Sequence, residues 1–147
     1  MIPKFRAWMK QYEKMDNDIG EMYFEDGEFK YIGDDVHYKR LPEHVILMLS
    51  TGIKDKNGKE IFEGDIITTN AYGCIVCFGE YTYFEDEHTQ TTGIGFYLSF
   101  LNVSPATYAP FEKFYWDNCK VIGNIHENEL DLIMYEAWKF NEEREDA

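Results

Sequence analysis

The cysteines are the residues whose spacing comes closest to a metal-binding or redox motif. Cys74 and Cys77 form a C-x-x-C pair, but two apolar residues separate them and the segment has the pattern of a β-strand. Positions i and i+3 of a strand face opposite sides of a sheet, so the two thiols diverge. Cys119 and His126 do not supply a second ligand pair at a suitable spacing. We therefore expect no zinc site, no redox pair and no cofactor.

The usual motifs of catalytic residues are not found in the sequence either. The four histidines lack the H-x-x-x-H or H-E-x-x-H spacing of a metalloenzyme. There is no G-x-S-x-G frame for a nucleophile and no glycine-rich phosphate loop. Asp34-Asp35 and Glu85–Glu87 do not have the spacing of a calcium loop. These observations favour a protein that is not an enzyme.

Acidic residues dominate the charge. The chain has 28 Asp and Glu against 14 Lys and Arg, a formal net charge of −14. Such a field repels nucleic-acid phosphates and anionic membranes, so we expect neither as a partner. The charge either keeps the protein soluble or imitates nucleic acid toward a basic partner. No apolar run reaches the ~18 residues of a membrane span. Without a secretion signal, and with an odd number of cysteines, the chain is expected in the cytoplasm.

Alternating apolar patterns and glycine-bearing turns predict a mainly β protein. Residues 4–9 have the pattern of a short strand, and the aromatic runs on either side of Asp26-Gly27 predict a hairpin. Asn57-Gly58 indicates a second hairpin, and Gly64 marks the bend before a β-branched strand at 66–69. Many short strands with such turns favour a small barrel over a sandwich.

Further strands are predicted in the second half of the chain. Residues 73–78 and 94–100 alternate in hydropathy, with a polar loop over 85–92 between them. In the strand predicted at 120–125, Gly123 indicates a bulge.

The last part of the chain has the pattern of an amphipathic helix. Apolar side chains recur every three or four residues over 128–140 and form one stripe. We expect one domain over 1–147, with four parts: N-terminal strands and a hairpin (4–35), a barrel core (45–126), the C-terminal helix (128–140) and a frayed acidic tail (141–147).

Two groups of residues are candidates for a binding surface. Charged and amide side chains gather around the Asn57-Gly58 turn and the Gly64 bend, where they face a ligand if a pocket lies there. Aromatic residues are dense at 81–84 and 111–116; they either fill the core or form a protein interface, where such rings are enriched. The candidates are Lys54, Asp55, Asn57, Asp65, Tyr81, Tyr83, Tyr115 and Trp116.

Three patches together resemble the YopX family of phage and prophage proteins. They are Phe5-Arg6-Ala7-Trp8, the long patch Thr51–Ile67, and Val121–Asn128, and the resemblance covers residues 4–134. It implies an SH3-like β-barrel core and a phage or prophage origin, and it implies no activity. Within the long patch, turn and bend formation explains the glycines, and we expect the Asp65 carboxylate to accept backbone amides of the bend.

The aromatic surplus and the missing catalytic motifs favour a non-enzymatic phage accessory protein that binds a host or phage protein in the bacterial cytoplasm. One alternative is an acidic mimic of nucleic acid that inhibits a host DNA-binding protein; its binding weakens steeply with salt. Another is a small ligand-binding domain or enzyme with Lys54, Asp55, Asn57 and Asp65 beside a pocket. A homo-oligomer joined through strand edges stays open as well.

Overall fold

The computed structural model describes residues 4–69 and 72–127. These form two compact units, which divide between Ser50 and Thr51. The expected helix at 128–140 and the tail at 141–147 lie outside the described residues. Among the residues that are described, no helix has the length and apolar character needed to cross a membrane.

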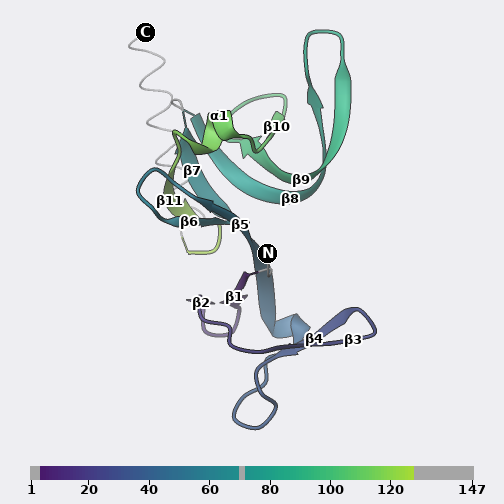
Figure 1. The fold of residues 1–147 in the computed structure, drawn as a ribbon, viewed down its shortest axis with the longest axis vertical. Helices are drawn as coiled ribbons and strands as arrows, with labels where there is room; N and C mark the ends of the chain where they lie inside the picture. The colour runs from purple at the N-terminus through teal and green to yellow at the C-terminus, as the bar shows by residue number, and fades with distance from the viewer. Residues whose placement is uncertain (1–3, 70–71, 128–147) are drawn as a thin grey trace. The chain divides into compact units, whose positions relative to one another are not determined.

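The first unit consists of short antiparallel strands. β1 pairs with β2 on one side and with residues 45–49 of β5 on the other, while β3 and β4 form a separate hairpin (Figure 1). The elements are β1 (Phe5–Met9), β2 (Lys14–Asp16), β3 (Met22–Glu25), β4 (Glu28–Ile32), one turn of 3₁₀-helix, η1 (Pro42–His44), and β5 (Val45–Lys54), which continues into the second unit.

The predicted strand at 4–9 and the predicted Asp26-Gly27 hairpin are both confirmed. Asp26 and Gly27 have φ values of 54° and 80°, the left-handed pair that a two-residue hairpin turn requires. Ala7, Ile32 and Val45 form the buried core of the first unit.

The second unit is built on a five-stranded antiparallel sheet in the order β10-β9-β8-β7-β11. In Figure 1 the two long strands of this sheet, β8 and β9, curl strongly along their length. The elements are β6 (Glu60–Phe62), which follows the turn after β5, then β7 (Asp65–Thr69), β8 (Tyr72–Phe84), β9 (Gln90–Phe100), β10 (Tyr108–Pro110), the single-turn helix α1 (Lys113–Trp116) and β11 (Lys120–Asn124).

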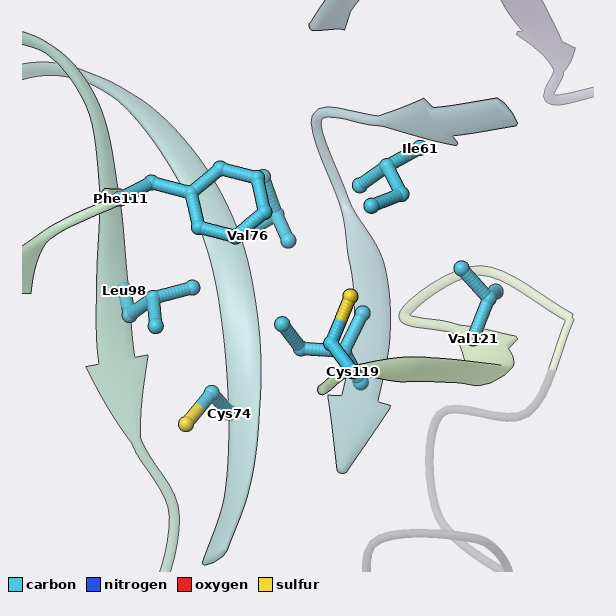
Figure 2. Packing of buried hydrophobic residues seen from close by; sticks show 8 residues of the cluster. Ile61, Cys74, Val76, Leu98, Phe111, Cys119 and Val121 are labelled. Atoms are coloured by element: carbon cyan, nitrogen blue, oxygen red, sulfur yellow. The ribbon is translucent and has the colours of Figure 1, made fainter. Parts of the chain in front are cut away.

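The core of the second unit lies against one face of this sheet. Figure 2 shows Leu98 and Phe111 on one side of the core and Ile61 and Cys119 on the other. The eight buried residues of the core are Ile61, Ile67, Cys74, Val76, Leu98, Phe111, Cys119 and Val121. The β11 register shifts between Val121 and Gly123, which is the bulge that the sequence predicts.

The chain is therefore mainly β, as expected, but two boundaries were wrong. β8 and β9 run as one unbroken ladder to the Phe84–Gln90 pair, so the expected polar loop over 85–92 shrinks to 85–89. Glycines at the middle of each strand hid the continuation, because glycine is depleted from strands. The short helix α1 was not predicted at all. The SH3-like closure of the barrel stays a prediction.

Candidate functional site

Asp55 fastens the turn between β5 and β6 to the start of β11. Its Oδ1 accepts the backbone N–H of Asn57 at 2.9 Å and of Lys59 at 2.8 Å, and its Oδ2 accepts the N–H of Val121 at 2.9 Å. Burial alone raises the pKa of this carboxyl, but the three amides outweigh it and hold the pKa below its ordinary value. The carboxylate thus has a structural task that spans 66 residues of sequence.

Two other polar side chains of the long patch are also buried and bound to backbone. Asp65 is completely buried, and its Oδ2 accepts the N–H of Phe62 at 2.8 Å, the bond to the bend that the sequence predicts. Thr51 Oγ1 donates to the carbonyl of Ile61 at 2.8 Å. Gly64, at φ 89°, makes the bend between β6 and β7. The patch that carries the family resemblance is therefore held together by side chains that bond its own main chain.

The remaining candidates near this turn face solvent. Lys54 and Asn57 are exposed, whereas Asp55 and Asp65 are buried, so the structure does not present the four as one surface. Their role in binding stays a prediction.

The aromatic candidates lie elsewhere in the second unit, and they separate into core and surface. Trp116 packs edge-on against Phe111 at 5.7 Å between ring centroids, beside the core. Tyr115 lies against Phe100 at 6.2 Å and is partly buried. Trp116 is thus mainly a core residue, while Tyr115 borders a hollow.

That hollow is lined mostly by rings. Its volume is about 450 Å³. It is bordered by Tyr72, Phe84, Phe100, Val103, Thr107, Tyr108, Ala109, Phe114 and Tyr115. Phe84 and Phe114 are 68% and 66% exposed, so much of their apolar surface at this hollow is open to solvent.

A second hollow of about 350 Å³ shares Tyr108 with the first. Glu80, Tyr81, Thr82 and Tyr97 complete its lining. Tyr81 and Tyr97 stack at 4.8 Å with an interplanar angle of 23°, and Tyr97 meets Tyr108 edge-on at 5.8 Å. We call these two hollows, which share Tyr108 in their linings, the aromatic trough.

The curl of β8 explains how the trough forms. Tyr72 and Phe84 border one hollow although they are twelve positions apart on one strand, a span of about 40 Å in a flat strand. Gly79 and Gly95 are direct partners in the β8–β9 ladder, with φ values of 145° and 144°. This backbone region is open essentially to glycine alone, so the pair permits the sharp bend.

Carboxylates act on tyrosines in and beside the trough. Burial raises the pKa of the Tyr81 and Tyr115 phenols, and the negative charge of Glu112 raises both further. Tyr83 donates its phenol hydrogen to Glu85 Oε1 at 3.3 Å. The trough is thus aromatic in its lining and negative at its rim.

Family comparison covers most of the chain. The model described as YopX protein matches residues 4–131. The chain belongs to the YopX family. Among solved structures, this YopX chain is similar to the crystal structure of protein EF1440 from Enterococcus faecalis, with 27% identity and a TM-score of 0.52, covering 90% of this chain and 99% of that one. Among curated proteins, none matches.

The thiols of this YopX chain have the character of core residues. Burial raises the pKa of Cys74 to about 12 and that of Cys119 to about 11, which keeps both protonated at neutral pH. Cys74 and Cys77 alternate between a buried and a half-buried position along β8, as the strand pattern predicts. Over 4–69 and 72–127, no group of His, Cys, Asp and Glu has the arrangement of a metal site.

The sequence indicated part of the trough and missed most of it. Tyr81, Tyr83 and Tyr115 were candidates, and the structure brings Tyr81 and Tyr115 to the two hollows. Phe84 and Phe114 lie in the aromatic runs that the sequence analysis singled out, whereas the missed lining rings are Tyr72, Tyr97, Phe100 and Tyr108. The missing signal was the pair of glycines that bends the hairpin, since the bend brings Phe84 to the hollow that Tyr72 also borders.

Proposed function

We propose that this YopX chain is a non-enzymatic accessory protein of phage or prophage origin. In this proposal it acts in the cytoplasm of a bacterial host, where its aromatic trough binds a segment of a host or phage protein. The observation that carries the proposal is the trough itself. Exposed rings gathered in a hollow lower the free energy when a partner covers them, and aromatic side chains are the usual anchors of protein interfaces.

The buried carboxylates support a binding role over an enzymatic one. The alternative hypothesis of a small enzyme requires Asp55 and Asp65 to lie beside a pocket. Both instead accept main-chain amides, and Asp55 has a lowered pKa, which is unfavourable for a general acid or base near neutral pH. In the acidic-mimic hypothesis the partner binds acidic residues and does not need the trough. The place on the chain where the partner binds therefore distinguishes that hypothesis from the proposal.

Photo-crosslinking from the trough tests the proposal. A benzoylphenylalanine is placed at Phe114 or, as a control, at Phe24, which is 49% exposed in the β3–β4 hairpin of the other unit. We expect the full chain in bacterial cells to form a defined protein adduct only from position 114. Adding Tyr108→Ala, which removes the ring shared by both hollows, should abolish that adduct. Equal adducts from position 24, or adducts that survive Tyr108→Ala, contradict the proposal.

A further inference from the structure

The rim of the trough restricts the charge of its occupant. Glu80 lines one hollow, Glu112 raises the pKa of the lining residues Tyr81 and Tyr115, and Glu85 accepts a hydrogen bond from the nearby Tyr83. None of the described lining residues is Lys or Arg. The nearby Lys113 is paired with Asp117, so its charge is balanced locally. An anionic ligand is repelled here and a cationic one is attracted.

The chemistry of the lining distinguishes one cation from another. Tyr81 and Tyr97 stack on each other beside Glu80, and both rings are half-buried, so part of each stays open to a ligand. A guanidinium is planar and weakly hydrated; it stacks on aromatic faces and bonds a carboxylate with two parallel hydrogen bonds. An ammonium is compact and strongly hydrated, so it gains less from rings. Arginine is therefore the side chain that uses both the rings and the rim.

The shape of the trough favours an extended occupant. Tyr108 lines both hollows, so a ligand that contacts both has to extend past that ring. Beyond the Gly79–Gly95 pair, β8 and β9 form a two-stranded ribbon, and no third strand pairs with it in the described part of the chain. An extended peptide fits such a site, since main-chain groups of the ribbon are available along its edges.

Charge argues against the two occupants that this chain itself supplies. Residues 127–147 carry eight acidic residues against Lys139 and Arg144, which places like charge at a negative rim. A second copy of the chain brings a net charge of −14 to the same rim. Both cost electrostatic free energy, whereas a basic segment gains it.

We infer that the aromatic trough takes an extended, arginine-bearing segment of a partner protein, with guanidinium groups between the tyrosine rings and the rim glutamates. This inference rests on the proposed function and names the partner chemistry of the same site.

Labelled synthetic peptides test the inference on the full chain. The probe is fluorescein-Gly-Arg-Leu-Arg-Val-Arg-Leu-Gly-amide, measured by fluorescence anisotropy. Its controls replace every arginine with citrulline, which keeps the shape and removes the charge, with lysine, which keeps the charge, or with glutamate. We expect arginine to bind most tightly, lysine about fivefold more weakly, and citrulline and glutamate at least tenfold more weakly. Equal affinity for the citrulline or glutamate peptide overturns the inference.

Variants of the protein locate the binding. Glu80→Gln and Glu112→Gln should each weaken the arginine probe about threefold, and this loss should disappear in high salt. Tyr81→Leu should weaken it about tenfold. The matched control is Glu127→Gln, an exposed glutamate that follows β11, at the edge of the sheet opposite β10. A loss in the control equal to that in the rim variants contradicts trough binding. Circular dichroism of each variant confirms that it is folded.

The two proposals fail in distinguishable ways. An adduct from position 114 whose partner segment lacks basic residues overturns the arginine inference and leaves the proposed function standing. Two results overturn the choice of occupant. If removal of 128–147 raises the affinity for the arginine probe tenfold, the chain's own C-terminal residues occupy the trough. If Tyr108→Ala changes the oligomeric state in sedimentation, a second copy of the chain occupies it. A probe that binds with the predicted order, and loses affinity in the rim variants, supports the inference.

Discussion

The ring of Tyr81 lies directly on Gly93, its partner across the β8–β9 ladder. A Cβ placed on Gly93 is 2.8 Å from both Cζ and Oη of Tyr81, closer than such atoms approach. Glycine at this position therefore lets the phenol lie flat over β9, in position to stack on Tyr97. The Tyr81–Tyr97 stack therefore depends on Gly93 having no side chain.

Gly93→Ala should displace the Tyr81 ring. The tip of a tyrosine swings away easily, so the free energy of unfolding should fall by only about 1 kcal/mol, the worth of one aromatic pair. The near-ultraviolet circular dichroism of the tyrosines should change because the Tyr81–Tyr97 stack is lost. Gly20→Ala is the matched control, since a Cβ there meets no atom within 4 Å and its φ is ordinary. An unchanged spectrum for Gly93→Ala contradicts this assignment.

Gly95→Ala should straighten the bend of the hairpin. A Cβ at Gly95 meets nothing within 4 Å, so the cost comes from the backbone angle, about 1–3 kcal/mol. Relief of that strain moves Phe84 away from Phe114. Spin labels on Phe84→Cys and Phe114→Cys report the distance; both positions are highly exposed. We expect a longer, broader distribution in the Gly95→Ala background and no change with Gly27→Ala, in the β3–β4 turn. An unaltered distance shows that the bend does not need this glycine.

Asp55→Asn should be among the most destabilising changes of a single polar group. Asparagine replaces one carboxylate oxygen with an NH₂ group, which cannot accept a hydrogen bond. Either the turn or Val121 therefore loses its acceptor, and a buried N–H is left without a partner. We expect a loss of about 1–3 kcal/mol in urea unfolding. Asp86→Asn is the control, because Asp86 accepts two amides in an exposed loop. A loss no greater than that of the control contradicts the structural role of Asp55.

The same carboxylate predicts how stability depends on pH. The pKa of Asp55 is lower in the folded chain than in the unfolded one, where it is near ~3.9. Its contribution is therefore fully present above that value and is lost as the pH falls toward the folded pKa. The stability difference between the parent chain and Asp55→Asn should be constant from pH 8 to 6 and should narrow below about pH 4. A difference that stays constant down to pH 3 contradicts the assignment.

The core thiols should resist modification. Cys74 and Cys119 are buried, and their pKa values of about 12 and about 11 leave almost no thiolate at pH 8. We expect iodoacetamide to modify neither residue in the folded chain and all 3 cysteines in urea, as read by mass spectrometry. Rapid labelling of Cys119 in the folded chain contradicts the burial of this thiol.

Local signals predicted most of the strands, because turn chemistry acts over a few residues. Asp26-Gly27, Gly64 and the Gly123 bulge lie where the sequence places them. The trough was only partly predicted, because it depends on a bend at a glycine pair that is distant in sequence and adjacent only in the ladder. Asp55 illustrates the same limit: its two bonds within the turn are local, whereas its bond to Val121 follows from the tertiary fold.

The bond from Asp55 to Val121 has a consequence for how such a protein diversifies. It joins the Thr51–Ile67 patch to the patch that begins at Val121, because the Asp55 side-chain carboxylate accepts the main-chain N–H of Val121. The β8–β9 hairpin, β10 and α1 all lie between these two anchors. Exposed residues of these segments can be replaced without altering the donor or the acceptor of the bond between Asp55 and Val121. The two patches joined by this bond are thus suited to support different recognition segments between them.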